Sequence, residues 1–233
     1  MDDDLNQKFF LSIGFKKISF KAMNSKNEFS FQKEILLNDK SIKENFNSLE
    51  IFLEKNIFEI EKNLNLHVKD IFLIIDYDNF LKVDLSSIYN FKNFFKKPHE
   101  ISSSLIEISN NFKKTAEDFE IIHTIINKFI TDGEIYFKMP KEEVYKNIYL
   151  EISFICLQKN IISSFRNILS KYQISLKKIL NYQYISHFKN DNERNIYVIA
   201  DRLIKGLNEN EIFLVNKVRK NKGFFEKFFN FFN

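Results

Sequence analysis

The chain has 233 residues, a hydrophobic share of 44% and a charged share of 28%, which fit one or two folded domains and exclude an intrinsically disordered protein. The formal net charge of +4 is too small to argue for nucleic acid as a partner, and Cys156 is the only cysteine, so an intramolecular disulfide is impossible. Aspartates occupy positions 2–4, where a signal peptide would need basic residues, and no apolar run approaches the roughly 20 residues that span a bilayer. We therefore expect a cytoplasmic protein.

Three strands are predicted near the start of the chain, at residues 9–13, 17–23 and 28–37. Short polar turns at 14–16 and 24–27 join them into a meander of antiparallel strands.

A long amphipathic helix follows over residues 41–64, with Ser41 as its N-cap. Its apolar positions recur at steps of three and four residues, at Ile42, Phe46, Leu49, Leu53, Ile57, Ile60 and Leu64. The continuous apolar run at 70–77 predicts a strand that is buried on both faces. A helix that leads into such a strand is typical of an α/β arrangement, so we expect this strand to pair in parallel with the first.

The pattern changes after Asn79. Residues 80–88 predict a strand, residues 89–97 a loop rich in Phe and Lys, and the next stretch a helix. The apolar face of that helix is marked by Ile101, Leu105, Ile108 and Phe112.

The stretch from 119 to 180 predicts strand, strand, helix and strand. The run at 119–131 is rich in Ile and Phe and stops at a turn pair, Asp132 and Gly133. Residues 149–157 predict a second strand, and residues 161–172 a helix with one apolar face.

The last strand of that stretch is predicted at 176–180. A further strand is predicted at 182–188 and a helix at 195–207, with Gly206 as its C-cap. Residues 211–215 form a final apolar segment.

The order of these motifs resembles the FtsA family of bacterial cell-division proteins. In that family an I-x-H-x-I strand is followed by an Asp-Gly turn, a Pro-containing loop, an apolar strand, a helix and a strand that enters an actin-like core. The matching positions here are Ile121, His123 and Ile125, then Asp132 and Gly133, then Pro140, then 150–156, then 161–172. The resemblance covers about 60 residues.

The resemblance implies an α/β (α+β) fold with a partial actin-like, or ribonuclease H-like, subdomain. Its predicted divisions are the subdomain at 1–79, an inserted strand-helix-strand-strand module at 80–175, a return to the core at 176–216, and a basic linker with an amphipathic tail at 217–233.

The first turn is where such folds hold ATP phosphate, and only Gly14 of that motif is kept. Ser12 stands in place of the metal-binding Asp, and Phe15 stands where backbone amides would approach phosphate. The loop that closes the second half of the ATP cleft in the family has no counterpart, so we expect a plain hairpin, no cofactor and no ATP turnover.

The tail carries the predicted membrane-binding residues. On a helix at about 100° per residue, six rings fall within an arc of roughly 160°. They are Phe224, Phe225, Phe228, Phe229, Phe231 and Phe232, and the basic residues Lys220, Lys222 and Lys227 accompany them. Family members end in such a helix, which holds them to the cytoplasmic face of the inner membrane. The alternative is that the tail packs into the protein's own core.

Other candidate sites have simpler explanations. The four histidines, His67, His99, His123 and His187, are scattered, so we expect no metal site and a core role for His123. Cys156 lies among apolar residues and is expected to be a buried, inert thiol. Asp76, Asp78 and Asp84 flank a strand end and are expected to be solvated turn residues.

The sequence therefore predicts a non-catalytic, FtsA-like cell-division protein that links divisome components to the cytoplasmic face of the inner membrane through a C-terminal amphipathic helix. Its expected partners are anionic lipids of that membrane and divisome proteins or another copy of itself, with no nucleic acid. The alternative function is a soluble α/β protein–protein interaction module.

Overall fold

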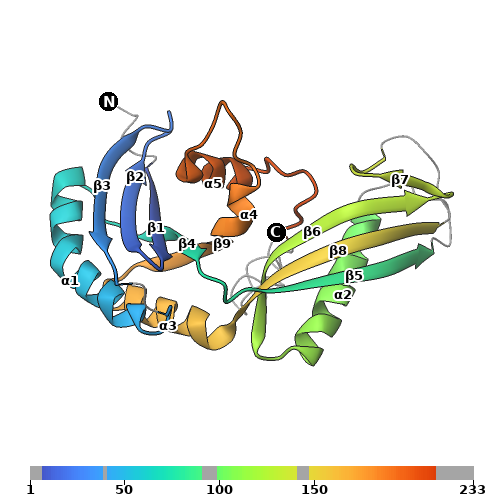
Figure 1. Ribbon diagram of the computed structural model, residues 1–233, viewed down its shortest axis with the longest axis horizontal. Helices are drawn as coiled ribbons and strands as arrows, with labels where there is room; N and C mark the ends of the chain where they lie inside the picture. The colour runs from blue at the N-terminus through green and yellow to red at the C-terminus, as the bar shows by residue number, and fades with distance from the viewer. Residues whose placement is uncertain (1–6, 39–40, 91–98, 141–146, 214–233) are drawn as a thin grey trace, which may run out of the picture.

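A computed structural model describes residues 7–38, 41–90, 99–140 and 147–213. These residues form two β-sheets that lie side by side, each with its own helices (Figure 1).

The larger sheet has the strand order β3-β2-β1-β4-β9. Its strands are β1 (Lys8–Gly14), β2 (Lys17–Met23), β3 (Phe29–Leu36), β4 (Asp70–Asp76) and β9 (Ser175–Asn181). The pairs β1–β2 and β2–β3 are antiparallel, whereas β4 lies parallel to both β1 and β9. The predicted meander and the parallel pairing of the fourth strand with the first are confirmed.

Helices cover both faces of the larger sheet. α1 (Asn45–Leu64) and α3 (Lys159–Ser170) pack on one face, and α4 (Tyr182–Ser186) and α5 (Ile196–Ile204) pack on the other. Successive side chains of β1 point to opposite faces of the sheet, so this strand contributes to the hydrophobic core on each face. Leu11 and Ile13 pack toward α1 and α3, and Phe10 packs toward α4 and α5.

The helix α1 begins at Asn45, four residues later than predicted. Ser41 instead opens the preceding turn, where its backbone N–H donates to the Glu44 carboxylate at 2.9 Å and its Oγ accepts from the Glu44 N–H at 3.4 Å. This reciprocal pair is the geometry of a capping box, so Ser41 performs the predicted task one turn earlier.

The smaller sheet has the order β5-β8-β6-β7 and is antiparallel throughout. Its strands are β5 (Leu81–Asn90), β6 (Phe119–Thr131), β7 (Glu134–Tyr136) and β8 (Asn147–Gln158). The helix α2 (His99–Thr115) covers one face. The predicted turn joins β6 to β7, with positive φ angles of 51° at Asp132 and 84° at Gly133 that suit a two-residue hairpin.

One element was predicted wrongly. Residues 182–188 were expected to form a strand, but they begin with α4. The side chain of Asn181 accepts a hydrogen bond from the Tyr184 backbone N–H at 2.6 Å, which caps the helix and starts it directly after β9.

The protein therefore has an α/β fold with a partial actin-like, ribonuclease H-like subdomain. Three antiparallel strands end in β1, two parallel strands continue the sheet, and the smaller sheet enters between β4 and α3. The helix α3 packs in the core of the larger sheet, beside α1. Within the described ranges, no helix is long and apolar enough to cross a membrane.

Candidate functional site

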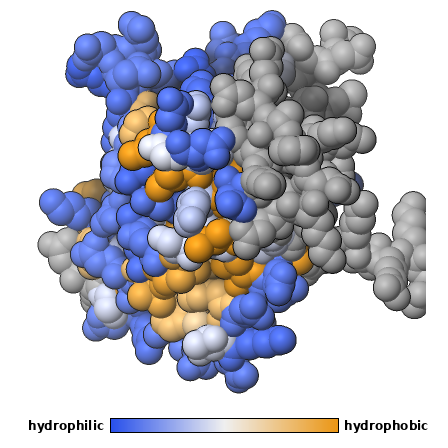
Figure 2. Space-filling view, turned by 90° about the vertical axis from the view of Figure 1, so that its right-hand side faces the viewer, coloured by the Kyte–Doolittle hydropathy of each residue, from blue (hydrophilic) through white to orange (hydrophobic). Residues whose placement is uncertain are grey.

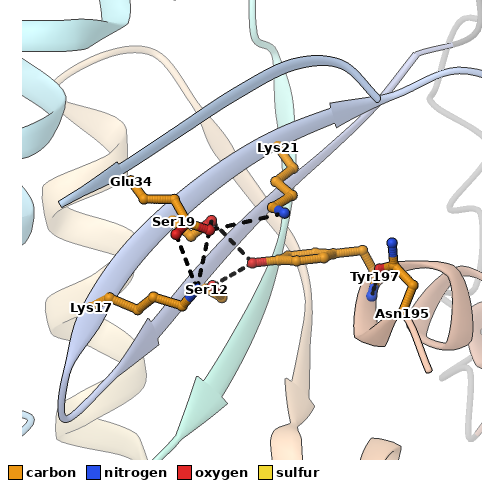
Figure 3. A network of polar contacts seen from close by, with 7 residues as sticks. All are labelled: Ser12, Lys17, Ser19, Lys21, Glu34, Asn195 and Tyr197. Atoms are coloured by element: carbon orange, nitrogen blue, oxygen red, sulfur yellow. Dashed lines mark hydrogen bonds and ion pairs between the residues drawn. The ribbon is translucent and has the colours of Figure 1, made fainter. Parts of the chain in front are cut away.

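The turn between β1 and β2 is the place where the resemblance puts a phosphate loop, and three hydroxyl groups of the neighbouring elements β1, β2 and α5 are bonded to one another beside it. Ser12 Oγ lies 2.8 Å from Tyr197 Oη, Tyr197 Oη lies 3.1 Å from Ser19 Oγ, and Ser19 Oγ donates to Glu34 Oε1 at 2.9 Å (Figure 3). Because Ser19 donates to the carboxylate, Tyr197 must donate to Ser19 and Ser12 to Tyr197. The chain of donors thus runs from β1, through α5, to β2 and β3.

Two lysines surround the carboxylate that ends this chain. Lys17 Nζ lies 3.1 and 3.0 Å from the two oxygens of Glu34, and Lys21 Nζ lies 3.9 Å from one of them. Burial alone would raise the pKa of Glu34, but hydrogen bonds from Lys17 and Ser19 and the charges of both lysines lower it. Glu34 is therefore held as an anion that pairs with both lysines.

Lys21 is also fixed by aromatic rings. Its Nζ lies 4.8 Å from the ring centroid of Tyr197 and 4.9 Å from that of Phe29. Burial lowers the pKa of Lys21, and the charge of Glu34 partly opposes this.

The tip of the same hairpin is closed by a second tyrosine. Tyr77 Oη donates to the Gly14 carbonyl at 2.7 Å and accepts from Asn45 Nδ2 at 2.5 Å. The ring of Phe15 lies 4.5 Å from that of Tyr77, between centroids. A Cβ atom at Gly14 would lie 3.2 Å from Cβ of Asp76, so the backbone at this glycine passes close against β4.

A second polar cluster lies where the two sheets meet. The Glu211 side chain is 2% exposed and receives hydrogen bonds from three elements, namely from His123 of β6 at 2.8 Å, Tyr184 of α4 at 2.9 Å and Lys178 of β9 at 3.4 Å. Burial would raise the pKa of Glu211, but the hydrogen bond from His123, together with Lys178 and Tyr184, lowers it.

His123 is buried, at 1% exposed, which confirms the predicted core role. Its Nε2 accepts from the Asn181 backbone N–H at 3.1 Å, so Nδ1 carries the proton and donates it to Glu211. Burial lowers the pKa of His123, although Glu211 acts in the opposite direction. With its free lone pair already used by a backbone amide, this histidine has a structural role and is not placed to accept a proton from a substrate.

The other candidates considered from sequence are kept apart or buried. Cys156 is buried, as predicted, and burial raises the pKa of its thiol to about 12. Asp78 accepts from Gln183, whereas Asp84 accepts from Ser153 in the smaller sheet. Considering only the residues that the structure describes, no group of three or more His, Cys, Asp and Glu side chains could hold a metal ion.

The predicted membrane-binding residues lie outside the described part of the chain, within 214–233. Sequence reasoning also missed three residues of the two polar clusters, Tyr184, Tyr197 and Glu211. The only signal for Glu211 was a carboxylate at the start of an otherwise apolar segment.

No protein-family model and no curated protein matches this chain. Among solved structures, it is similar to the cytoplasmic domain of EpsL, an inner membrane component of the type II secretion system of Vibrio cholerae. The identity is 6%, 77% of this chain and 57% of that chain are covered, and the TM-score is 0.39.

Two further similarities are of the same kind. The PilM-PilN type IV pilus biogenesis complex shows 5% identity, coverage of 86% of this chain and 52% of that chain, and a TM-score of 0.46. A Bacteroides thetaiotaomicron protein with an actin-like ATPase fold shows 15% identity, coverage of 81% and 58%, and a TM-score of 0.33. The chain thus spans between half and three fifths of the length of these three proteins. Because identity and TM-scores are low, the assignment of an actin-like fold rests on the sheet topology.

Proposed function

We propose that this chain is a non-catalytic, actin-like protein that binds other proteins at the inner membrane, as an FtsA-like component of bacterial cell division. The observation that carries this proposal is the filled turn between β1 and β2. Ser12, Ser19 and Lys17 are bonded within the chain, and the Gly14 carbonyl accepts from Tyr77. The hydroxyl and ammonium donors beside this turn, which could otherwise bind a phosphate, are bonded within the chain and hold β1, β2, β3 and α5 together.

The surface for partners is the outer face and far end of the smaller sheet. Ile88 and Tyr149 are register partners on β5 and β8, are 57% and 45% exposed, and face away from α2. On and just after β7, Ile135 and Phe137 are 56% and 67% exposed. Figure 2 shows hydrophobic residues gathered on this end of the molecule and bordered by hydrophilic ones. Exposed apolar area of this kind favours association with another protein, either a divisome component or a second copy.

The membrane role is assigned to the tail. Each Phe that is fully buried contributes roughly 1.5 to 3 kcal/mol, and each basic residue near an anionic leaflet contributes about 1 kcal/mol. The six rings, with Lys220, Lys222 and Lys227, thus contribute a free energy of the same size as the cost of ordering the segment, so we expect attachment to be reversible.

Vesicle flotation tests the membrane role. The intact chain, a chain truncated after Lys220, and a Phe228→Glu variant are mixed with vesicles of phosphatidylcholine alone or with phosphatidylglycerol. We expect only the intact chain to float, and to float better with the anionic lipid. Equal flotation of the intact and truncated chains would remove the membrane role, and resistance of the tail to proteolysis without lipid would favour the soluble interaction module.

A further inference from the structure

The residues after α5 connect the two sheets. Residues 208–213, here called the strap, run from the end of α5 to the edge of β6 (Figure 1). The Ile126 N–H donates to the Asn210 carbonyl at 3.0 Å, and the Ile212 N–H donates to the Thr124 carbonyl at 2.8 Å. The strap therefore pairs with the smaller sheet as a short antiparallel strand.

The strap also contacts the larger sheet and its helices. Asn208 Nδ2 donates to Tyr184 Oη at 2.9 Å, and Lys178 Nζ lies 3.7 Å from the ring centroid of Phe213. Just before the strap, Gly206 follows the end of α5 with a φ of 93°, so the chain turns there from the helix toward the strap.

Glu211 sits at the centre of the strap, and its carboxylate contacts both sheets at once. His123 comes from the smaller sheet, whereas Lys178 and Tyr184 come from β9 and α4. A carboxylate with so little exposure is stable only while these donors surround it, because its own burial opposes its charge. Moving one sheet relative to the other would separate the donors, so the charge favours a single arrangement.

We propose that the strap is a latch, closed by Glu211, that fixes the orientation of the smaller sheet relative to the larger one.

The latch is tested without lipid by hydrogen exchange and by distances between spin labels. Labels are placed at the exposed positions Ser25→Cys and Glu134→Cys, one on each sheet, while the buried Cys156 stays unlabelled. In Glu211→Gln we expect exchange at the amides of Ile126 and Ile212 to rise about tenfold or more, since bonds to a charged group are lost. The distance distribution should broaden at the same time.

The matched control is Glu209→Gln, two residues earlier in the strap. Glu209 pairs at 3.4 Å with Lys138, and both side chains are exposed, so neither exchange nor distances should change. If circular dichroism shows that Glu211→Gln does not fold, the variant Tyr184→Phe is used in its place. It removes only one of the donors to the Glu211 carboxylate. A folded Glu211→Gln or Tyr184→Phe variant with unchanged exchange and distances would overturn the latch.

Discussion

Substitution of Tyr77 by Phe tests whether the Tyr77 hydroxyl stabilises the turn between β1 and β2. The variant keeps the ring, which is 2% exposed and packs beside Phe15, and it removes only the hydroxyl. Two hydrogen bonds are lost, to the Gly14 carbonyl and from Asn45. At about 1 kcal/mol each, and with a carbonyl that loses its donor, we expect the free energy of unfolding to fall by about 2 kcal/mol.

Urea unfolding measures this change, with Tyr182→Phe as the matched control. The Tyr182 hydroxyl only accepts from the exposed Lys189 at 3.2 Å, so its loss should change stability by less than about 0.5 kcal/mol. Equal changes in the free energy of unfolding for the two substitutions would mean that the Tyr77 hydroxyl does not stabilise the β1–β2 turn.

The same urea titration also tests whether a nucleotide binds at the β1–β2 turn. A ligand at about 100 times its Kd would raise the free energy of unfolding by ~2.7 kcal/mol, so ATP with magnesium at millimolar concentration would reveal micromolar binding. We expect no increase for the parent chain or for Tyr77→Phe. An increase near that size would refute the interpretation that intramolecular bonds have replaced phosphate binding.

Long periodic segments were predictable because their signal is repeated many times. The apolar positions of α1 recur over twenty residues, and β4 is apolar at every buried position, so helix, strand and parallel pairing all follow from pattern. The core role of His123 followed from its apolar neighbours. In each of these cases the information is local in the sequence.

Features that depend on distant residues were not predictable. The five residues of α4 make less than two turns, and their alternating Tyr-Gln-Tyr-Ile pattern suits a strand as well as a helix. His123 and Glu211 are 88 residues apart, and no local pattern in either segment indicates that they meet. The junction between the sheets therefore emerged only from the three-dimensional arrangement, whereas the tail remains a prediction.

Three further changes probe helix packing and the junction. Ser41→Ala should lower the free energy of unfolding by about 1 kcal/mol, because it removes half of a capping box. Phe165→Ala should lower it by about 3–5 kcal/mol, since this ring is fully buried under α1, and urea unfolding measures both.

Acid should also destabilise the protein, because the pKa of His123 lies below its ordinary value of 6.5 in the folded state. The unfolded chain then binds more protons, so this stability is complete above about pH 6.5 and declines as the pH falls below it. Glu211, whose pKa is also lowered, adds a second loss as the pH falls below about 4.5. Urea midpoints at about pH 8 and pH 5 should therefore differ for the parent and much less for His123→Gln. If the two proteins showed the same pH dependence, His123 would not be the neutral, buried group that holds Glu211 between the sheets.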